Sequence, residues 1–179
     1  MRLAILGSTR GTHLLTFIEA IAAKKISATI ELVMSNKADA LILERAREHG
    51  LRAHFENTEQ KISEKLHAYN IELIILVGYM KILSGDFIKE WENKIINVHP
   101  SLLPAFAGKM SQDVHRAVLE SKVKETGCTV HFVTEEVDAG PILIQKKCLV
   151  LPDDTVDTLK SRVQQLEKEA LVESVRGLQ

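Results

Sequence analysis

The sequence predicts an α/β fold: an open, mostly parallel sheet with helices on both faces and an antiparallel hairpin near the C-terminus. Three observations predict it. Short apolar runs alternate with amphipathic segments over the first hundred residues, as strands joined by helical crossovers do. A glycine-containing turn joins the first such run to the first amphipathic segment. After Pro104, two extended runs flank a single turn, which is typical of a hairpin.

The N-terminal half contains the parallel part of the sheet. A first strand is expected at 2–6, and the apolar stripe from Leu14 to Ile21 predicts the helix that follows it. The remaining strands expected in this half lie at 30–34 and 73–77, with a further one over 95–99. The remaining helices are expected at 40–49 and 61–69.

The C-terminal half contains the hairpin and the last helix. A helix is expected at 114–119, and strands at 127–133 and 142–150 flank a turn with Asp138. The last helix begins near Thr155, with Asp153, Asp154 or Thr155 as N-cap. Its apolar face is expected to contain Leu159, Val163, Leu166 and Ala170.

The composition indicates a globular chain without a strong charge. With 179 residues, 45% hydrophobic and 26% charged, it suits one domain over 1–179. The 23 basic and 24 acidic side chains give no electrostatic attraction toward nucleic acid or an anionic membrane. We therefore expect neither nucleic acid nor membrane as a partner.

No feature of the sequence indicates export. The apolar run at 3–6 is too short for a signal peptide, and no segment has membrane-spanning length. Cys128 and Cys148 lack metal-ligand spacing and are expected as core-facing thiols, so no metal site is predicted. These observations favour a cytoplasmic protein.

An amide and an imidazole stand two residues apart at the end of a predicted strand. Asn97 and His99 point the same way because side chains alternate along a strand, and Pro100 ends the strand there. Asp138 follows later, in a turn that ends Gly140-Pro141. An amide, an imidazole and a carboxylate can stabilise an oxyanion and move a proton. A pair of structural capping residues is the alternative for Asn97 and His99.

The turn between the first strand and the first helix is a candidate phosphate site. Gly11, Thr12 and His13 lie where helix N-terminal amides favour an anion, and Arg10 adds a positive charge. Hydroxyl groups of Ser8, Thr9 and Thr12 are further possible donors. The turn matches neither a dinucleotide fingerprint nor a P-loop, so a small phosphorylated metabolite or a simple tight turn is expected.

Two further groups have either a functional or a structural interpretation. The loop from Gly78 to Leu83 could form an apolar pocket wall for a flat ligand, or belong to the core. His131, in the middle of a strand, is more typical of a structural group than of a catalyst. Four more histidines are expected at the surface: His49, His54, His67 and His115.

The chain closely resembles the folate-dependent phosphoribosylglycinamide formyltransferases. The run Asn97-Val98-His99-Pro100-Ser101-Leu102-Leu103-Pro104, followed by Asp138-Ala139-Gly140-Pro141, is specific for the formyltransferase superfamily. Similarity at 35–40, 78–83 and 129–133 extends over nearly the whole chain. The resemblance implies a Rossmann-like formyltransferase fold, with a phosphate side in the N-terminal half and a folate side in the C-terminal half.

The resemblance also implies a reaction. A formyl group would pass from 10-formyltetrahydrofolate, as co-substrate, to the amine of glycinamide ribonucleotide in de novo purine (IMP) synthesis. The transfer would be direct, through a tetrahedral intermediate, with Asn97, His99 and Asp138 as the catalytic residues. The protein would act as a monomer or homodimer.

Binding residues are implied in the same way. Arg10, Gly11, Thr12 and His13 would bind the phosphate, and Gln164 and Glu167 the rest of the acceptor substrate. The folate would contact Met80, Lys81, Ile82, Leu83, Val137 and Asp138.

The sequence differs from the usual family pattern at several places. In the phosphate loop, Thr9 stands where glycine is common and His13 where asparagine is common. Lys81 stands where arginine is frequent, and the segment 105–115 has a longer spacing. Two alternatives therefore stay open. One is a related formyltransferase or formyltetrahydrofolate hydrolase with another acceptor, and the other is a non-catalytic ligand-binding domain of the same fold.

Overall fold

The computed structural model of the chain describes residues 1–109 and 111–179. Its internal contacts form two compact units, 1–97 with Gln179, and 98–178. The single domain expected over 1–179 stays a prediction.

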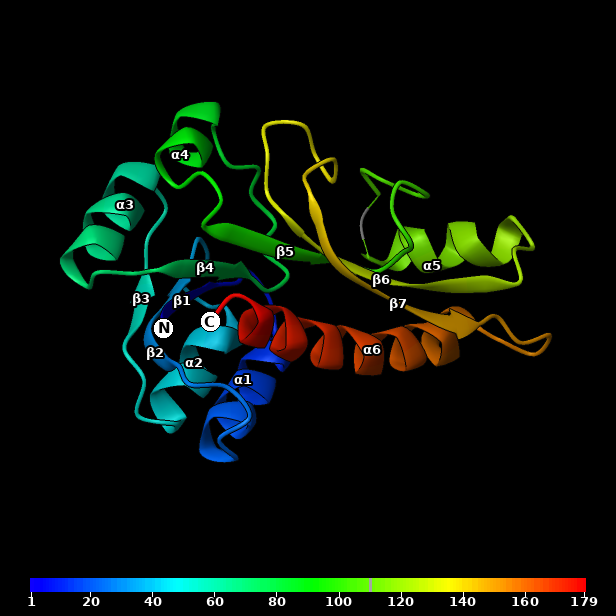
Figure 1. The fold of residues 1–179 in the computed structure, drawn as a ribbon, viewed down its shortest axis with the longest axis horizontal. Coiled ribbons are helices and arrows are strands. Elements are labelled where there is room, and N and C mark those ends of the chain that lie inside the picture. The colour runs from blue at the N-terminus through cyan, green and yellow to red at the C-terminus, as the bar shows by residue number, and fades with distance from the viewer. Residues whose placement is uncertain (110) are drawn as a thin grey trace. The chain divides into compact units, whose positions relative to one another are not determined.

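The described strands form one sheet in the order β3-β2-β1-β4-β5-β6-β7 (Figure 1). Their bounds are β1 Arg2–Leu6, β2 Thr29–Ser35, β3 Ala53–Phe55, β4 Leu73–Leu76, β5 Ile95–His99, β6 Glu125–Phe132 and β7 Ile142–Leu149. The pairs β1 with β2, β1 with β4, β2 with β3, and β4 with β5 are parallel, whereas β6 and β7 are antiparallel. The predicted mostly parallel sheet with a C-terminal hairpin is confirmed.

The described helices connect these strands. Their bounds are α1 Thr12–Ala22, α2 Leu41–Glu48, α3 Glu59–Ala68, α4 Gly85–Glu90, α5 Ser111–Glu120 and α6 Val156–Gly177. The expected helices are all present. The three-residue strand β3 and the six-residue helix α4 were not expected from the sequence.

The first unit has its core on β1 and β4. Residues Leu3–Leu6 are fully buried and Leu73–Leu76 nearly so, which explains why both strands read as uninterrupted apolar runs rather than alternating patterns. Helices α1 and α2 lie side by side, and α2 packs on β2 and β3 (Figure 1).

The second unit is built from the hairpin and α6, which runs alongside β6 and β7 (Figure 1). Thr155 is the N-cap of α6, in a capping box with Thr158. Cys128 is buried as expected, whereas Cys148 is half-buried, and both are free thiols.

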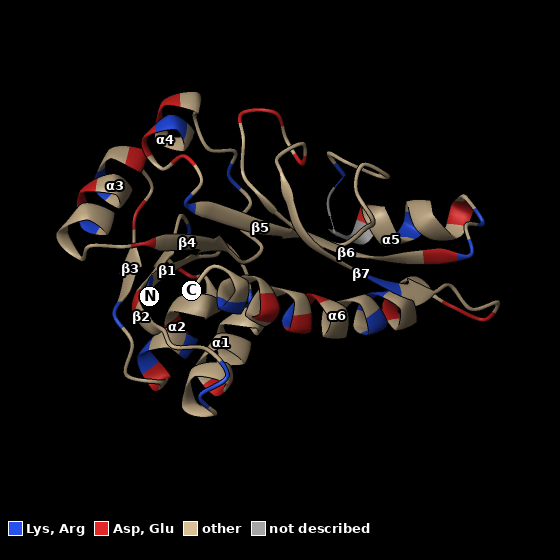
Figure 2. Cartoon of the chain, in the orientation of Figure 1, with Lys and Arg blue, Asp and Glu red and all other residues tan. Residues whose placement is uncertain are grey.

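Charged residues of both signs are mixed along the helices. Acidic and basic residues alternate along α3 and α6 (Figure 2). Within 1–109 and 111–179, no helix combines the length and the apolar character needed to cross a membrane.

Candidate functional site

Strand β5 places the polar pair of the sequence motif. Ile95 and Ile96 are buried, and the strand ends at His99 because Pro100 cannot continue a ladder. Asn97 is the last residue of this run in the first unit, two positions before His99, so the two side chains leave the strand on the same face.

His99 and Asp138 form an ion pair in the second unit. Nδ1 of His99 lies 3.1 Å from Oδ2 of Asp138, and both side chains are almost fully buried. The backbone amide of Gly108 donates to the same oxygen at 2.9 Å. Asp138 has a left-handed backbone, φ 58°, in the turn between β6 and β7. The turn therefore directs its carboxylate to the end of β5.

The second nitrogen of His99 also faces an acceptor. Nε2 lies 3.2 Å from the carbonyl oxygen of Phe106. A carbonyl only accepts hydrogen bonds, so Nε2 carries a proton. In a neutral ring, Nδ1 would then direct its lone pair at the Asp138 carboxylate. The contacts therefore suit a doubly protonated, positively charged His99.

Burial opposes this charge. It lowers the pKa of His99 below the usual value, while the charge of Asp138 and the Phe106 carbonyl raise that pKa in part. Burial alone would raise the pKa of Asp138. The His131 imidazole, the Gly108 amide and the His99 charge outweigh it and bring the pKa of Asp138 below its usual value. Asp138 is thus ionised at neutral pH, and its charge partly offsets the effect of burial on the pKa of His99.

His131 is a second histidine on the same carboxylate. Its Nε2 lies 3.6 Å from Oδ1 of Asp138, an ion-pair distance, while Nδ1 donates to the Phe132 carbonyl at 2.9 Å. Sequence reasoning ranked His131 as structural. The signal that could have revealed it is its position near the end of β6, close in the sequence to Asp138.

Thr129 fixes the loop that follows β5. Its hydroxyl donates to the Ser101 carbonyl at 2.7 Å and accepts from the Leu103 amide at 3.0 Å. Gln145, on β7, donates to the Leu103 carbonyl at 2.9 Å. These bonds satisfy the buried backbone of the Pro-Ser-Leu-Leu-Pro run and hold it against β6 and β7.

Gly140 explains the glycine of the second motif. A Cβ at this position would lie 1.8 Å from the Phe132 carbonyl oxygen. Pro141 in turn accepts from the Phe132 amide at 2.9 Å. Only glycine permits this close approach, which sets the base of the Asp138 turn.

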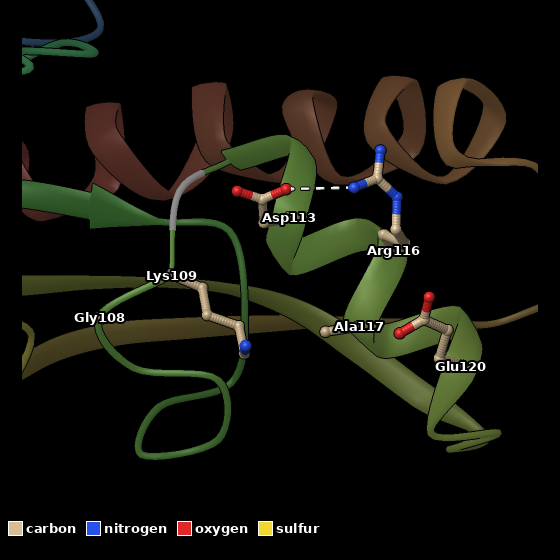
Figure 3. Close-up of a pocket in the computed structure, with 6 residues that line it drawn as sticks. All are labelled: Gly108, Lys109, Asp113, Arg116, Ala117 and Glu120. Atoms are coloured by element: carbon tan, nitrogen blue, oxygen red, sulfur yellow. Dashed lines mark hydrogen bonds and ion pairs between the residues drawn. The ribbon is translucent and has the colours of Figure 1, made fainter.

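A cavity of about 420 Å³ lies between Gly108 and α5 (Figure 3). Its charged lining is mixed: Lys109, Asp113, Arg116 and Glu120, with Arg116 paired to Asp113 at 3.3 Å. The segment 105–115 was expected to differ from the family pattern. It contains Met110, which lies outside the described residues. Gly108 contributes both to this cavity and to the Asp138 contact.

The prediction that His115 is a surface residue is wrong. Its side chain, on α5, is 1% exposed, and Nδ1 has no hydrogen-bond partner among the described residues. Burial lowers the pKa of His115, and the charge of Glu167 partly offsets this. The reason is helix geometry, because position 115 lies beside the buried Val114 and one turn before Val118.

The residues expected to contact the acceptor from α6 share one helix face. Gln164 and Glu167 are three positions apart, and Glu167 is 6% exposed. The negative charge of Glu167 raises the pKa of both His99 and His115 in part, so all three lie within electrostatic reach of one another. Leu166, expected on the buried face, is only half-buried, and Glu167 takes its place.

The candidate phosphate turn lies at the start of α1 in the first unit. Gly11 is the N-cap, with φ 64°, and provides no side-chain hydrogen bond to the first amides of the helix. The first turn contains no acidic residue. Arg10 is exposed, Thr12 half-buried and His13 buried. This helix end is suited to an anion.

The Ser8 hydroxyl, expected as a possible phosphate donor, makes two hydrogen bonds within the protein. Its hydroxyl donates to Oδ1 of Asn36 at 2.6 Å and accepts from the Met80 amide at 2.8 Å. Since a hydroxyl has one proton, that proton is already used. Ser8 instead joins the loops that follow β1, β2 and β4.

The loop after β4 exposes apolar side chains. Met80 is 45% and Ile82 77% exposed, while Leu83 is buried and Lys81 donates to the Asn57 carbonyl at 3.1 Å. In the second unit, Val137 next to Asp138 is 50% exposed. Within the first unit, the exposed side chains of Met80 and Ile82 could contact the apolar part of a ligand.

No group of three or more His, Cys, Asp or Glu side chains in the described part of the chain could hold a metal ion.

Comparison with known proteins identifies the family of this chain. The formyl transferase family model matches residues 1–175. Phosphoribosylglycinamide formyltransferase of Escherichia coli is 39% identical over 93% of this chain and 82% of its own length. The trifunctional purine biosynthetic protein adenosine-3 of Gallus gallus is 42% identical over 95% of this chain, but the chain spans only 18% of that protein.

Solved structures give the same result. Glycinamide ribonucleotide transformylase 1 from Symbiobacterium toebii superposes with a TM-score of 0.92 at 38% identity, over 98% of this chain and 86% of that one. The enzyme from Anaplasma phagocytophilum gives the same TM-score at 35% identity, over 98% of this chain and 84% of that one. The chain therefore belongs to the formyl transferase family and, within it, to the phosphoribosylglycinamide formyltransferases.

Proposed function

We propose that this chain transfers the formyl group of 10-formyltetrahydrofolate to the amine of glycinamide ribonucleotide. The observation that carries the proposal is the buried pair of His99 and Asp138, with acceptors on both imidazole nitrogens. Binding alone would need no such pair. A transferase needs it, because an oxyanion forms and a proton must move.

The reaction proceeds by direct attack. The amine nitrogen forms a bond to the formyl carbon, and the carbonyl π electrons move to oxygen, which gives a tetrahedral oxyanion. The imidazolium of His99 and the amide of Asn97 donate hydrogen bonds to this oxyanion. The intermediate then collapses as the bond from carbon to N10 of the folate breaks.

Asp138 supports the proton transfer. Its charge favours the imidazolium form of His99, which burial disfavours. The proton lost by the attacking amine is passed on to the departing N10, so the products are the formamide and tetrahydrofolate. His131 holds the other oxygen of Asp138 and so acts as a positioning residue.

The remaining predicted residues bind substrate. The first turn of α1, with Arg10, Gly11, Thr12 and His13, binds the phosphate through backbone amides and one positive charge. Gln164 and Glu167 bind the glycinamide ribose portion of the acceptor.

The folate contacts are proposed from the exposed apolar residues. Met80 and Ile82, together with Lys81 and Leu83, contact the folate from the loop after β4. Val137 and Asp138 contact it from the β6 to β7 turn.

The compartment and assembly are part of the same proposal. We expect a cytoplasmic enzyme, monomeric or homodimeric, with no metal and no resident cofactor. Its two ligands are small molecules.

Formyl transfer from 10-formyltetrahydrofolate, measured with and without glycinamide ribonucleotide, tests the function. Turnover that depends on the acceptor is the expected result. Equal turnover without acceptor would instead identify a hydrolase. No turnover in either case would indicate a different acceptor or a binding protein.

A further inference from the structure

The segment Ala105–Gly108, called the 105–108 segment below, contacts both members of the catalytic pair through its backbone. The Phe106 carbonyl accepts from Nε2 of His99 at 3.2 Å, and the Gly108 amide donates to Oδ2 of Asp138 at 2.9 Å. One short segment thus provides a hydrogen-bond acceptor for His99 and a hydrogen-bond donor for Asp138.

The backbone conformation of this segment is unusual. Phe106 has φ 61° and Gly108 φ 73°, both in the left-handed region. Glycine adopts that region freely, whereas a bulky residue such as phenylalanine rarely does. A non-glycine residue held there is a sign that the surrounding structure imposes the conformation.

The start of the segment is anchored. The buried Ser101 hydroxyl donates to the Ala105 carbonyl at 2.5 Å, and the Ala105 amide donates to the Leu102 carbonyl at 3.1 Å. Ala107 donates to the Pro104 carbonyl at 3.4 Å. These bonds link the position of the Phe106 carbonyl to the Pro-Ser-Leu-Leu-Pro run after β5.

We propose that the 105–108 segment is a backbone clamp for the catalytic pair, with Phe106 as a positioning residue. The clamp keeps a proton on Nε2 of His99 and keeps Asp138 ionised. During catalysis the Nε2–H group of His99 moves its hydrogen bond from the Phe106 carbonyl to the formyl oxygen, a step that rests on the proposed function.

The exchange favours the transition state. The formyl oxygen of the bound substrate is a neutral carbonyl acceptor, as the Phe106 carbonyl is. In the ground state, His99 therefore gains little hydrogen-bond energy by changing from one acceptor to the other. The oxyanion is a charged acceptor and binds the same proton about twice as strongly. Because the Phe106 carbonyl competes for this hydrogen bond, His99 stabilises the substrate mainly when negative charge develops on the formyl oxygen.

Two variants separate the backbone from the side chain. Phe106→Pro fixes φ near −65° and moves the carbonyl away from His99. Phe106→Ala keeps the left-handed backbone and removes only the ring, so it is the matched control. The first readout needs no substrate: NMR of ¹⁵N-labelled histidine reports the proton on Nε2 and the titration of His99.

The expected result is a lower apparent pKa of His99 in Phe106→Pro than in the parent or in Phe106→Ala. In the second readout, kcat of Phe106→Pro falls about tenfold or more, while KM for either substrate changes by less than about threefold. An unchanged His99 titration in a folded Phe106→Pro protein would overturn the clamp, whatever the activity.

A second change covers the case in which Phe106→Pro does not fold. Replacement of Ala107 by its α-hydroxy analogue turns the preceding amide into an ester and weakens the Phe106 carbonyl as an acceptor. The same decrease in the His99 pKa is expected, and its absence would also overturn the clamp. Since the NMR readout is independent of turnover, loss of the proposed function alone would leave this result intact.

Discussion

Oδ1 of Asp138 lies 3.6 Å from His131, and Oδ2 of the same carboxylate lies 3.1 Å from His99. One negative charge is therefore shared by two buried histidines. Each of these histidines donates its other ring proton to a backbone carbonyl, Phe106 for His99 and Phe132 for His131. The charge of Asp138 opposes the lowering of the His99 pKa that burial causes.

Asp138→Asn should remove that charge while keeping the shape of the side chain. The pKa of His99 should then decrease further, because the charge of Asp138 that raises it is gone. Burial would still lower this pKa, and the Phe106 carbonyl would raise it only in part. We expect kcat to fall by about 10² to 10⁴ and the alkaline limb of the rate profile, on which His99 loses its proton, to shift to lower pH. Glu135→Gln, an exposed change in the same turn, is the control. A parental pH profile in Asp138→Asn would contradict the assigned role.

His99→Ala should separate chemistry from binding. The variant loses the cation that stabilises the oxyanion, so we expect turnover to fall by at least about 10³. Folate affinity should stay within about threefold, since the exposed apolar residues Met80 and Ile82 are unchanged. Stopped-flow turnover and fluorescence titration with folate measure the two effects. Unchanged turnover would refute the assignment of His99.

Stability should decrease as pH falls from 7 toward 5. Burial lowers the pKa of His54, His99 and His115 from the unfolded value of 6.5, so below that value the unfolded chain takes up protons before the folded one. The contribution of these histidines to the free energy of unfolding is therefore complete above pH 6.5. It decreases as the pH falls below 6.5. Thermal unfolding across this range should show a flatter slope for His115→Gln than for the parent. The exposed His49→Gln is the control, and equal slopes for both variants would argue against a neutral, buried His115.

Gly11→Ala should destabilise the first unit and weaken acceptor binding. A Cβ at this position would lie 2.4 Å from Cγ1 of Ile42, in addition to the cost of φ 64°. We expect a loss of about 2 to 4 kcal/mol in unfolding free energy. Gly50→Ala is a matched control, because Gly50 has φ 69° and nothing within 4 Å of its added Cβ. Equal losses in both variants would exclude a role for the Ile42 contact.

Asp154→Asn should destabilise the start of α6. Asp154 accepts two hydrogen bonds from Arg162, at 2.7 and 2.8 Å, one from the Leu151 amide and one from Thr158. The Arg162 bonds, followed by the Leu151 and Thr158 bonds, hold the pKa of Asp154 far below its usual value although burial opposes them. The variant should lose about 1 to 3 kcal/mol at pH 7, and less as pH falls below 3.8. Denaturant unfolding measures this, with the exposed Asp153→Asn as control. An equal loss for both variants would indicate a general charge effect at the helix start.

The fold was predictable because its strong signals are local. The apolar runs at β1 and β4 are buried on both faces, and the motif around Asn97 and His99 combines strand alternation with a proline stop. The elements that were missed are β3 and α4, which are short, and their residues form no periodic pattern. Such elements depend on the neighbours they pack against rather than on their own sequence.

The site was predictable only in part, because burial in the second unit depends on tertiary packing. Leu166 is a natural candidate for a buried helix position, but α6 buries Glu167 instead. His115 looked like a surface residue in a polar segment, although its neighbours Val114 and Val118 mark the buried side of α5. The contacts of Phe106 and Gly108 are backbone contacts, and no side-chain pattern records them.

The hydroxyl of Ser8 has a consequence for the evolution and engineering of this protein. Because one atom joins the loops after β1, β2 and β4, a loop exchanged alone with a relative would break a hydrogen bond in a loop that was not exchanged. Substitutions in the three loops should therefore be epistatic, and transplantation of all three loops together should retain function where single transplants lose it.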